Sequence, residues 1–347
     1  MAAVRNPFPS KKRKVKLTQL QTGLSIRKLL LESGFLKKEL NHLIPIVNGT
    51  RTSMDYELQD SDHLWITFPL GGGSNMNQEY YYPSSLEEAL NLLTKESTEI
   101  IAGGTHLATS KNGAISNFVD ITRLGLGYIK KDQQIVRVGS TTTITELIES
   151  PIISEVGNGI LTKACQLIAD TPLRNVITLG GNIARTYPWV GLPVVLLVLD
   201  AEIEIKSLED TKKVPANEYY KGGKLKKGAI ITEIAFPIRN DYFCRYEKFA
   251  LTTVDYSWLT MAFTARNENG KIVDPHLAVS RITKAQRVTS VEEFLERKSL
   301  TNLDIETAVV TLRKSVKIVA DYRSSKIYRE HLLGVLFRRM LEEMREG

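Results

Sequence analysis

The sequence predicts an α+β protein with three parts, which we expect to span residues 1–73, 74–240 and 241–347. In the first part, strand-like and helix-like segments lead to a run of three glycines. In the second, helices with recognisable N-terminal caps lie among strand-like segments. In the third, alternating strands are followed by two helices. A length of 347 residues is enough for two or three domains with cores of their own.

The composition narrows the class of protein. Hydrophobic residues make up 42% of the chain and charged residues 24%, which is typical of a soluble globular protein. No apolar run reaches the length of a membrane span, and no signal-peptide pattern opens the chain. Cys165 and Cys244, the two cysteines, lack metal-ligand spacing and cannot hold an iron–sulfur cluster through four thiolates. We therefore expect a cytoplasmic protein with buried thiols and without a membrane span.

The formal net charge of +7 comes mainly from the first 16 residues, which contain six basic and no acidic side chains. Within them, Lys11–Lys14 is similar to a nuclear or nucleic-acid-binding tag. Further along the chain, aromatic and basic residues do not interleave as they do on a nucleic-acid platform. We favour a solvated lead-in to the first strand and expect no nucleic-acid partner.

Residues 14 to 73 form the predicted small domain. Lys14–Leu17 alternates as a half-buried strand does, and Ser25 can cap a helix that Gly34 would end. Ile44–Val47 is a short apolar strand, and the Asn-Gly pair after it is a strong hairpin signal. The apolar residues of two further predicted strands are Leu58, Trp65, Ile66 and Phe68.

The order strand, helix, hairpin and strand, ending in Pro69-Leu-Gly-Gly-Gly73, resembles the ubiquitin-like β-grasp sulfur carriers of thiamine and molybdopterin synthesis. In those carriers the terminal glycine carboxylate is adenylated. Here Gly73 continues into Ser74, so a free carboxylate would require cleavage of the chain. We favour a β-grasp docking domain followed by a glycine linker, with a working carrier as the alternative.

Two capping-box patterns predict helix starts in the second part, Ser84 with Glu87 and Thr143 with Glu146. Pro193–Asp200 is apolar enough to form a helix that is buried on all sides. Strand-like segments separate these helices. They are residues 100–101, 118–120, 135–138 and 202–205.

Two glycine pairs mark a candidate cofactor site. Ile101 ends a strand-like segment that leads directly into Gly103 and Gly104, and the second pair lies between Thr178 and Asn182. Glycine carries no Cβ and tolerates positive φ, so backbone N–H groups can converge on an anion. Either pair alone also suits an ordinary tight turn. Together they predict two turns that hold the phosphates of a dinucleotide, without a Rossmann or Walker motif.

The third part predicts strands at 246–250, 259–265 and 277–279, with a turn at Asn267–Gly270. Two helices close the chain. The apolar stripe of the last helix recurs every four residues, at Tyr328, Leu332, Leu336 and Met340.

Four ordered motifs together resemble a known family. They are Ala102-Gly-Gly-Thr-x-Leu107, Arg174-Asn-x-x-Thr-Leu-Gly-Gly-Asn-Ile-Ala184, Tyr246-Glu-Lys-Phe-Ala250 and Asp321-Tyr-Arg-Ser-Ser-x-x-Tyr-Arg329. In this order they are similar to the FAD-binding subunit of the molybdenum hydroxylases, the xanthine dehydrogenase and carbon monoxide dehydrogenase family. The resemblance covers roughly residues 76 to 347.

The resemblance implies a two-part α+β FAD-binding domain of the vanillyl-alcohol-oxidase (PCMH) type and a C-terminal three-stranded sheet with helices over one face. Together with the chemistry of the glycine pairs, it assigns the contacts to FAD to three groups of residues. These are the first phosphate turn, Ala102, Gly103, Gly104 and Thr105; the second, Thr178, Gly180, Gly181 and Asn182; and the surroundings of the flavin ring and ribityl chain, Ile101, His106, Leu107, Ala184 and Lys248. The cofactor itself performs the redox step, so no catalytic residue and no metal ligand is assigned.

Two of these residues allow another interpretation. Lys248 would place positive charge beside the flavin ring and favour its reduced anion, or it is an exposed strand lysine. His106 would shuttle protons near neutral pH, or it is only a polar neighbour of the cofactor. The sequence also departs from the family pattern, since His106 replaces an acidic residue, Gly191 an aspartate and Thr252 an arginine. Each departure would loosen FAD or alter access for the electron acceptor.

The predicted function is electron transfer through FAD within a larger complex. In the family, electrons leave a molybdenum site, pass through two-iron, two-sulfur clusters and reach FAD, and an external acceptor such as NAD then takes them. Because this chain lacks ligands for either metal centre, we expect a molybdopterin-binding subunit and a two-iron two-sulfur subunit as partners. A scaffold subunit with a degenerate flavin site and a stand-alone flavin oxidoreductase are the alternatives.

Overall fold

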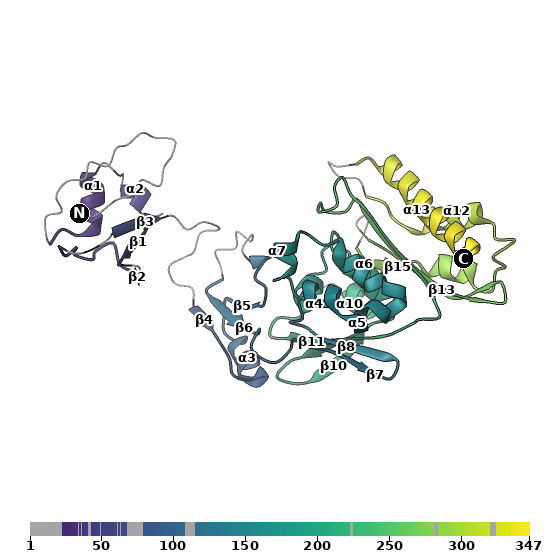
Figure 1. Cartoon of the computed structure of the whole chain (residues 1–347), viewed down its shortest axis with the longest axis horizontal. Helices are drawn as coiled ribbons and strands as arrows, with labels where there is room; N and C mark the ends of the chain where they lie inside the picture. The colour runs from purple at the N-terminus through teal and green to yellow at the C-terminus, as the bar shows by residue number, and fades with distance from the viewer. Residues whose placement is uncertain are drawn as a thin grey trace. The chain divides into compact units, whose positions relative to one another are not determined.

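The computed structural model describes residues 23–33, 35, 37–40, 43–48, 50–60, 62, 64–67, 79–107, 115–222, 225–280, 284–319 and 324–347. By their contacts these residues fall into two compact units, one ending at Thr67 and one beginning at Glu79 (Figure 1). Several sequence predictions lie outside the described residues, among them the basic lead-in at 11–14, the strand at 14–17, the helix end at Gly34, Gly49 of the hairpin pair, Phe68 and the glycine run at 71–73. No helix in the described ranges is long and apolar enough to cross a membrane.

The first unit is a small antiparallel sheet with two short helices, and β1 pairs with both β2 and β3. Its elements are α1 (Ile26–Glu32), α2 (Lys37–Leu40), β1 (Ile44–Val47), β2 (Thr50–Arg51) and β3 (Leu64–Thr67). The Ser25 hydroxyl accepts a hydrogen bond from the Lys28 N–H at 3.3 Å, which confirms the predicted cap of α1. The strand predicted around Leu58 is wrong. Glu57 makes only an isolated bridge to Ser25, and Leu58 fills the core between the helix and the sheet.

The second unit begins with three parallel strands, in which β6 lies between β4 and β5. The elements are β4 (Glu79–Tyr81), α3 (Leu86–Leu92), β5 (Thr98–Ile101) and β6 (Asn117–Asp120). The predicted cap of α3 is wrong by one residue. Ser85, and not Ser84, accepts a hydrogen bond from the Glu88 N–H, at 3.1 Å. The Glu88 carboxylate in turn accepts one from the Ser84 N–H at 2.7 Å, one residue before the cap, so Ser85 and Glu88 take the places expected for Ser84 and Glu87.

A five-stranded antiparallel sheet follows, in the order β10-β9-β11-β8-β7. Its strands are β7 (Ile129–Asp132), β8 (Ile135–Gly139), β9 (Glu202–Lys206), β10 (Thr211–Pro215) and β11 (Ile230–Pro237). The helices of this region are α4 (Ile144–Glu149), α5 (Pro151–Glu155), η2 (Val156–Gly159), α6 (Ile160–Gln166), α7 (Thr171–Arg174), α8 (Leu179–Ile183), α9 (Leu192–Val198) and α10 (Ala216–Gly222). Thr143 and Glu146 form the predicted capping box at the start of α4.

Every residue of α9 is buried, which confirms the prediction from its continuous apolar run. The reason lies in its position. α9 contacts α6 and α10 on one side and strands β13 and β14 of the next sheet on the other, so no face of this helix reaches solvent.

The last part of the chain forms an antiparallel sheet in the order β12-β13-β14-β15. Its strands are β12 (Phe243–Phe249), β13 (Leu259–Glu268), β14 (Lys271–Ser280) and β15 (Gln286–Arg287). The prediction of three strands is therefore wrong. β15 pairs with β14 over two residues, too few for alternation to be visible in the sequence. The predicted turn between β13 and β14 is confirmed, because Asn269 and Gly270 both have positive φ, 54° and 76°.

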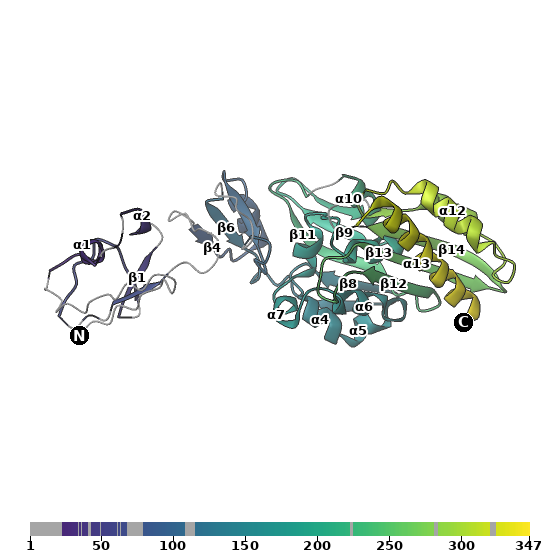
Figure 2. The ribbon, with the colours of Figure 1, turned by 90° about the horizontal axis from the view of Figure 1, so that it is seen from above.

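Both faces of this sheet are covered, because successive side chains of β13 point into two different cores. Met261 and Phe263 pack into the core with the C-terminal helices, whereas Ala262 joins the core around α9. The helices are α11 (Thr289–Leu295), α12 (Ile305–Ser315) and α13 (Lys326–Glu346). Figures 1 and 2 show α12 and α13 side by side over the sheet. The predicted stripe of α13 is buried at Leu332, Leu336 and Met340, but Tyr328 is exposed.

Candidate functional site

The first glycine pair forms the predicted turn at the end of β5. The chain leaves the strand after Ile101, and Gly104 adopts a φ of 68°, which favours glycine. Among the described residues, none accepts a hydrogen bond from the backbone N–H groups of Ala102, Gly103, Gly104 or Thr105. These half-buried N–H groups are donors that a phosphate could accept.

Packing within the protein also requires a glycine at position 103. A Cβ at this position would collide with the carbonyl oxygen of Val176, in the segment before the second glycine pair. The absence of a side chain at Gly103 therefore allows two parts of the protein backbone to touch. This contact is independent of any ligand.

The prediction of a turn at the second glycine pair is wrong. Gly180 and Gly181 lie in the first turn of α8, and neither has a positive φ. Thr178 caps this helix, since its hydroxyl accepts a hydrogen bond from the Gly181 N–H at 3.1 Å. The Gly180 N–H donates to the Ser140 carbonyl at 2.8 Å. The N–H groups of this pair are thus used inside the protein and do not converge on an open site.

Asn182 is the residue of the second segment whose surroundings fit a ligand. Its side-chain oxygen Oδ1 is buried and has no hydrogen-bond partner among the described residues. A buried acceptor without a donor costs roughly 1–3 kcal/mol. A hydroxyl group of a bound ribityl chain could donate a hydrogen bond to this oxygen and remove that cost. Asn182 therefore fits a contact with FAD.

The structure brings the two glycine segments together. Besides the contact at Gly103, Arg185 forms an ion pair with Glu99 of β5, with 3.1 Å between Nη2 and Oε2. The Tyr187 hydroxyl and Nε2 of His106 are 3.4 Å apart. The residue after α8, Ala184, has its carbonyl oxygen engaged by the Tyr219 hydroxyl at 3.1 Å. Each contact joins residues far apart in the sequence.

His106 lies directly after the first turn, beside the half-buried Leu107. Burial is the main cause that lowers the pKa of His106, and the positive charge of Arg185 acts in the same direction. The imidazole is therefore neutral near pH 7. This state favours the interpretation of His106 as a polar neighbour in the site over that of a proton shuttle at neutral pH.

Lys248 is not the exposed strand lysine that one interpretation expected. Its ammonium donates hydrogen bonds to the carbonyl oxygens of Leu167 at 2.7 Å and Thr253 at 2.9 Å. Burial lowers the pKa of Lys248, and the nearby Asp255 carboxylate opposes that shift. Within the described residues, no hydrogen bond or ion pair joins Lys248 to either glycine segment. Lys248 ties the end of α6 to the loop that follows β12.

One departure from the family pattern has a structural reason. A Cβ at Gly191 would collide with the hydroxyl of Tyr246, a fully buried residue of β12. An aspartate at this position would have to displace the Tyr246 hydroxyl. Thr252, the other departure in this region, lies exposed in the loop after β12.

Sequence analysis missed a group of aromatic residues. The rings of Tyr187 and Trp189 stack with centroids 4.5 Å apart and planes at 10°, and Tyr256 lies 5.8 Å from Trp189. The signal available in the sequence was the pair of aromatic residues on either side of Pro188, directly after the second glycine segment.

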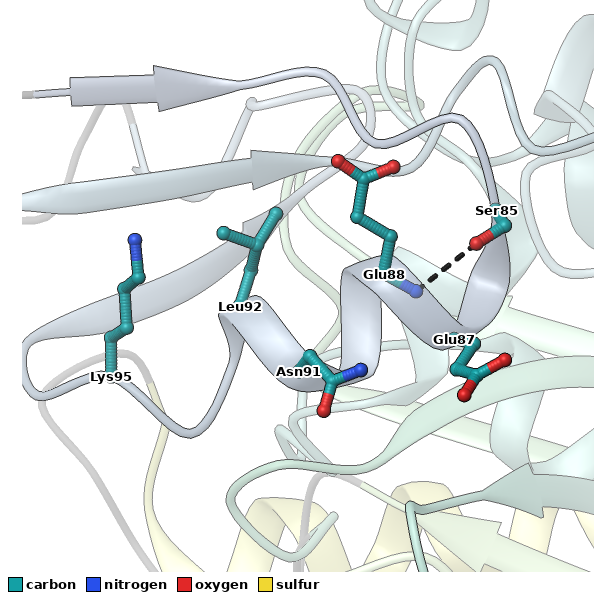
Figure 3. A pocket seen from close by; sticks show the side chains of 6 residues that line it. All are labelled: Ser85, Glu87, Glu88, Asn91, Leu92 and Lys95. Carbon is teal, nitrogen blue, oxygen red and sulfur yellow. Dashed lines mark hydrogen bonds between the residues drawn. The ribbon is translucent and has the colours of Figure 1, made fainter.

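A hollow of about 420 Å³ lies on the surface beside α3, and no residue of either glycine segment lines it (Figure 3). It is lined by Ser85, Glu87, Glu88, Asn91, Leu92 and Lys95. Figure 3 shows the hydrogen bond from the Glu88 N–H to Ser85 that caps the helix. The two carboxylates would repel a diphosphate, so this hollow is not a site for a dinucleotide.

Comparison with known proteins gives two family matches in chain order. Residues 74–239 match the FAD binding domain in molybdopterin dehydrogenase, and residues 245–344 match the CO dehydrogenase flavoprotein C-terminal domain. The 6-hydroxypseudooxynicotine dehydrogenase complex subunit alpha of Paenarthrobacter nicotinovorans is 30% identical over 275 residues, which are 76% of this chain and 93% of that protein. The glyceraldehyde dehydrogenase medium chain of Sulfolobus acidocaldarius is 28% identical, with 76% and 97% covered.

A solved structure agrees with these matches. A chain of the reconstituted CO dehydrogenase from Oligotropha carboxidovorans superposes with a TM-score of 0.73 at 26% identity, and the match covers 79% of this chain and 99% of that one. With the α+β fold and the two glycine segments, these findings give the family. The chain belongs to the FAD-binding medium subunits of the molybdenum hydroxylases, oxidoreductases of the xanthine dehydrogenase family, and its cofactor is FAD.

Proposed function

We propose that this chain is the electron-transfer subunit of a cytoplasmic molybdenum hydroxylase-type complex. It takes electrons from the clusters of a two-iron two-sulfur subunit and passes them through FAD to an external acceptor, for which NAD is one candidate. A molybdopterin-binding subunit completes the assembly. The names of the relatives support this proposal, since they are a medium chain and a subunit of a dehydrogenase complex.

The observation that carries the proposal is the set of unused N–H groups at the end of β5. Four successive backbone donors, from Ala102 to Thr105, have no acceptor among the described residues. Donors that are already oriented bind phosphate oxygens without further ordering of the chain. We assign the pyrophosphate of FAD to this turn.

The other residues would orient the cofactor. The amide of Asn182 would bind the ribityl chain. Thr178 caps the first turn of α8 through the N–H of Gly181, and Gly180 packs against Ser140, directly after β8. The flavin ring would lie among Ile101, His106, Leu107 and Ala184. When bound, FAD supplies the redox chemistry. Lys248 would act indirectly, because it positions the loop after β12.

The N-terminal unit belongs to the same proposal. We propose that residues 1–73 form a β-grasp domain that docks a partner subunit, and that residues 74–240 and 241–347 form the FAD-binding and C-terminal domains. The described part of the first unit, a helix packed on an antiparallel hairpin and a third strand, is compatible with that fold.

A titration of FAD tests the assignment of the site. Asn182→Ala should weaken FAD binding by roughly three- to tenfold, because one hydrogen bond to the cofactor is lost. Asn175→Ala is the matched control, since Asn175 is exposed and, among the described residues, its side chain bonds to Thr145 alone. The measurement is calorimetric titration of FAD into apoprotein, with the bound flavin quantified by its absorption spectrum.

Each contrary result has a distinct meaning. Equal affinities of wild type and Asn182→Ala would remove the second segment from the FAD site. A wild-type protein without flavin, even after reconstitution, would favour a scaffold subunit with a degenerate site. Substrate oxidation by this chain alone would favour a stand-alone flavin oxidoreductase.

A further inference from the structure

The Arg174 side chain binds the backbone at the end of α6. Its Nη1 group lies within hydrogen-bonding distance of three carbonyl oxygens, those of Gln166 at 3.2 Å, Ile168 at 3.2 Å and Ala169 at 3.1 Å. Nη2 donates to the Thr171 hydroxyl at 2.9 Å. One guanidinium therefore fixes the whole turn between α6 and α7, in which Ala169 has a φ of 40°.

These bonds matter because α7 has no apolar anchor of its own. None of its four residues, Thr171–Arg174, is buried, and Leu173 and Val176 are 42% and 43% exposed. α6, in contrast, buries residues such as Leu161 in the core of the second unit. A short helix without buried side chains gains little from packing, so polar contacts decide where it lies. Arg174 ties α7 to a helix that the core holds in place.

A contact with α4 adds less support to this segment. The Thr145 hydroxyl donates a hydrogen bond to the side-chain oxygen of Asn175 at 2.7 Å, and both groups are exposed. A bond between two neutral, exposed groups contributes less than bonds from a charged donor. The guanidinium of Arg174, with four acceptors, is therefore the main side-chain support of α7.

The position of α7 sets that of Val176, which touches the first glycine turn. The Val176 N–H donates to the Leu173 carbonyl at 3.1 Å, which attaches this residue to α7. On the other side the chain is fixed to α4, because the Ile144 N–H donates to the Ile177 carbonyl at 2.9 Å. The Val176 carbonyl lies against Gly103, where a Cβ would collide with its oxygen. A shift of α7 would therefore move the backbone that supports the first turn.

We propose that Arg174 is a positioning residue for the pyrophosphate of FAD. It acts through Val176, whose carbonyl supports Gly103 and so keeps the N–H groups of residues 102–105 in the arrangement that a phosphate accepts. This inference rests on the proposed function, because that function assigns the pyrophosphate to this turn. Loss of Arg174 therefore lowers the affinity for the phosphates of the cofactor and not for its flavin ring.

The first test compares three ligands in calorimetric titrations of the full-length apoprotein. ADP carries the diphosphate without the flavin, riboflavin carries the flavin without phosphates, and FAD carries both. Arg174→Met should weaken the binding of FAD and ADP by the same factor and leave riboflavin binding unchanged. If only about one molecule in ten still holds the turn in place, that factor is about ten. Arg297→Met is the matched control, since its side chain is 65% exposed and lies after α11.

The second test separates positioning from a general loss of stability. Thermal unfolding of the apoproteins gives the temperature below which every variant is folded, and the titrations are made there. Millimolar guanidinium should restore ADP binding to Arg174→Ala, because this ion can bind the same carbonyl groups, whereas an equal concentration of sodium should not. Arg174→Lys should restore ADP binding only in part, since an ammonium lacks the planar fork of the guanidinium.

Several outcomes would refute the role of Arg174. These are equal ADP affinities of wild type and Arg174→Met, a loss of riboflavin affinity as large as that of FAD, and equal rescue by sodium and guanidinium. If wild type binds ADP but no FAD, the proposed function fails, and the ADP titrations still decide the role of Arg174. If wild type binds FAD but no ADP, the pyrophosphate is not held by this turn, and the inference alone fails.

Discussion

At this site, packing within the protein explains the glycines at three positions as well as cofactor binding does. Gly103, Gly180 and Gly191 stand where a Cβ would meet, respectively, a backbone carbonyl, the Ser140 side chain at 2.6 Å, and the Tyr246 hydroxyl. A glycine motif that suits a phosphate can therefore also serve close packing between segments. An experiment can distinguish phosphate binding from close packing, because close packing also affects the stability of the apoprotein.

Gly103→Ala should destabilise the folded chain in the absence of FAD. The added methyl group would collide with the Val176 carbonyl, and overpacking of this kind costs typically 1–3 kcal/mol. Gly222→Ala is the control, because a Cβ there would meet no atom within 4 Å. Thermal unfolding of both apoproteins measures the difference. A Gly103→Ala apoprotein as stable as wild type that nevertheless loses FAD would show that this glycine serves the ligand alone.

Elements from the five-stranded and the four-stranded sheets of the second unit meet in a network of charges around His276. The Arg239 guanidinium, after β11, lies 3.0 Å from Nδ1 of His276, and Nε2 of the same ring lies 3.1 Å from Asp274. Nδ1 also lies 3.2 Å from the Val198 carbonyl and 3.2 Å from a carboxylate oxygen of Asp200. Asp200, at the end of α9, accepts a hydrogen bond from Arg287 at 2.7 Å and pairs with Arg239. The network joins α9 and β11 to strands β14 and β15.

This network predicts a loss of stability in acid. Burial first, and the positive charge of Arg287 second, lower the pKa of His276 in the folded protein. In the unfolded chain the pKa is about 6.5. As the pH falls below that value, the unfolded chain binds a proton that the folded protein does not, so the free energy of unfolding decreases, by at most about 1.4 kcal/mol per pH unit for one proton. The decrease ends below the folded pKa.

Urea denaturation at pH 7.5 and 5.5 measures this effect. His276→Asn should lose less stability between the two pH values than wild type, because one linked proton is removed. His331→Asn is the control, since His331 is exposed on α13. An equal pH dependence of wild type and His276→Asn would show that this histidine does not carry the acid sensitivity.

At the scale of the whole molecule, the chain consists of a family portion and an added N-terminal unit. The family matches begin at residue 74 and end at residue 344. The first unit has its own core, which includes Leu30, Leu58 and Leu64. A unit with its own core can be removed without opening the core of the remainder.

Deletion of residues 1–73 should leave FAD bound and weaken the recovery of partner subunits in a pull-down from the native host. The physical reason is that the FAD contacts assigned here lie after residue 100, whereas docking is assigned to the N-terminal unit. Flavin absorption and the yield of co-purified subunits measure the two effects. Full recovery of the partners would contradict the docking role. A natural fragment that ends at Gly73 and carries a thiocarboxylate, detected by mass spectrometry, would establish a sulfur carrier instead.

Much of the fold was predictable because its signals are local. The capping box at Thr143, the buried run of α9 and the Asn269-Gly270 turn depend on residues within a few positions of one another. The errors have equally physical causes. At Thr178, a helix cap and a phosphate turn share the same local pattern. In the folded chain, Gly180 packs on Ser140 and donates its N–H to the Ser140 carbonyl, contacts that the local pattern does not reveal.

The sequence by itself determined the family, the cofactor and the two glycine segments that approach it, because these depend on which residues follow one another along the chain. The tertiary structure decided which backbone N–H groups lack an acceptor among the described residues, which carbonyl groups accept hydrogen bonds from Lys248, and which rings lie against one another. Several of the contacts behind these properties join residues 80 or more positions apart, as between His106 and Tyr187 or Leu167 and Lys248. A local sequence pattern cannot predict contacts between residues so far apart in the chain, because these contacts form only when separate elements pack on a common core.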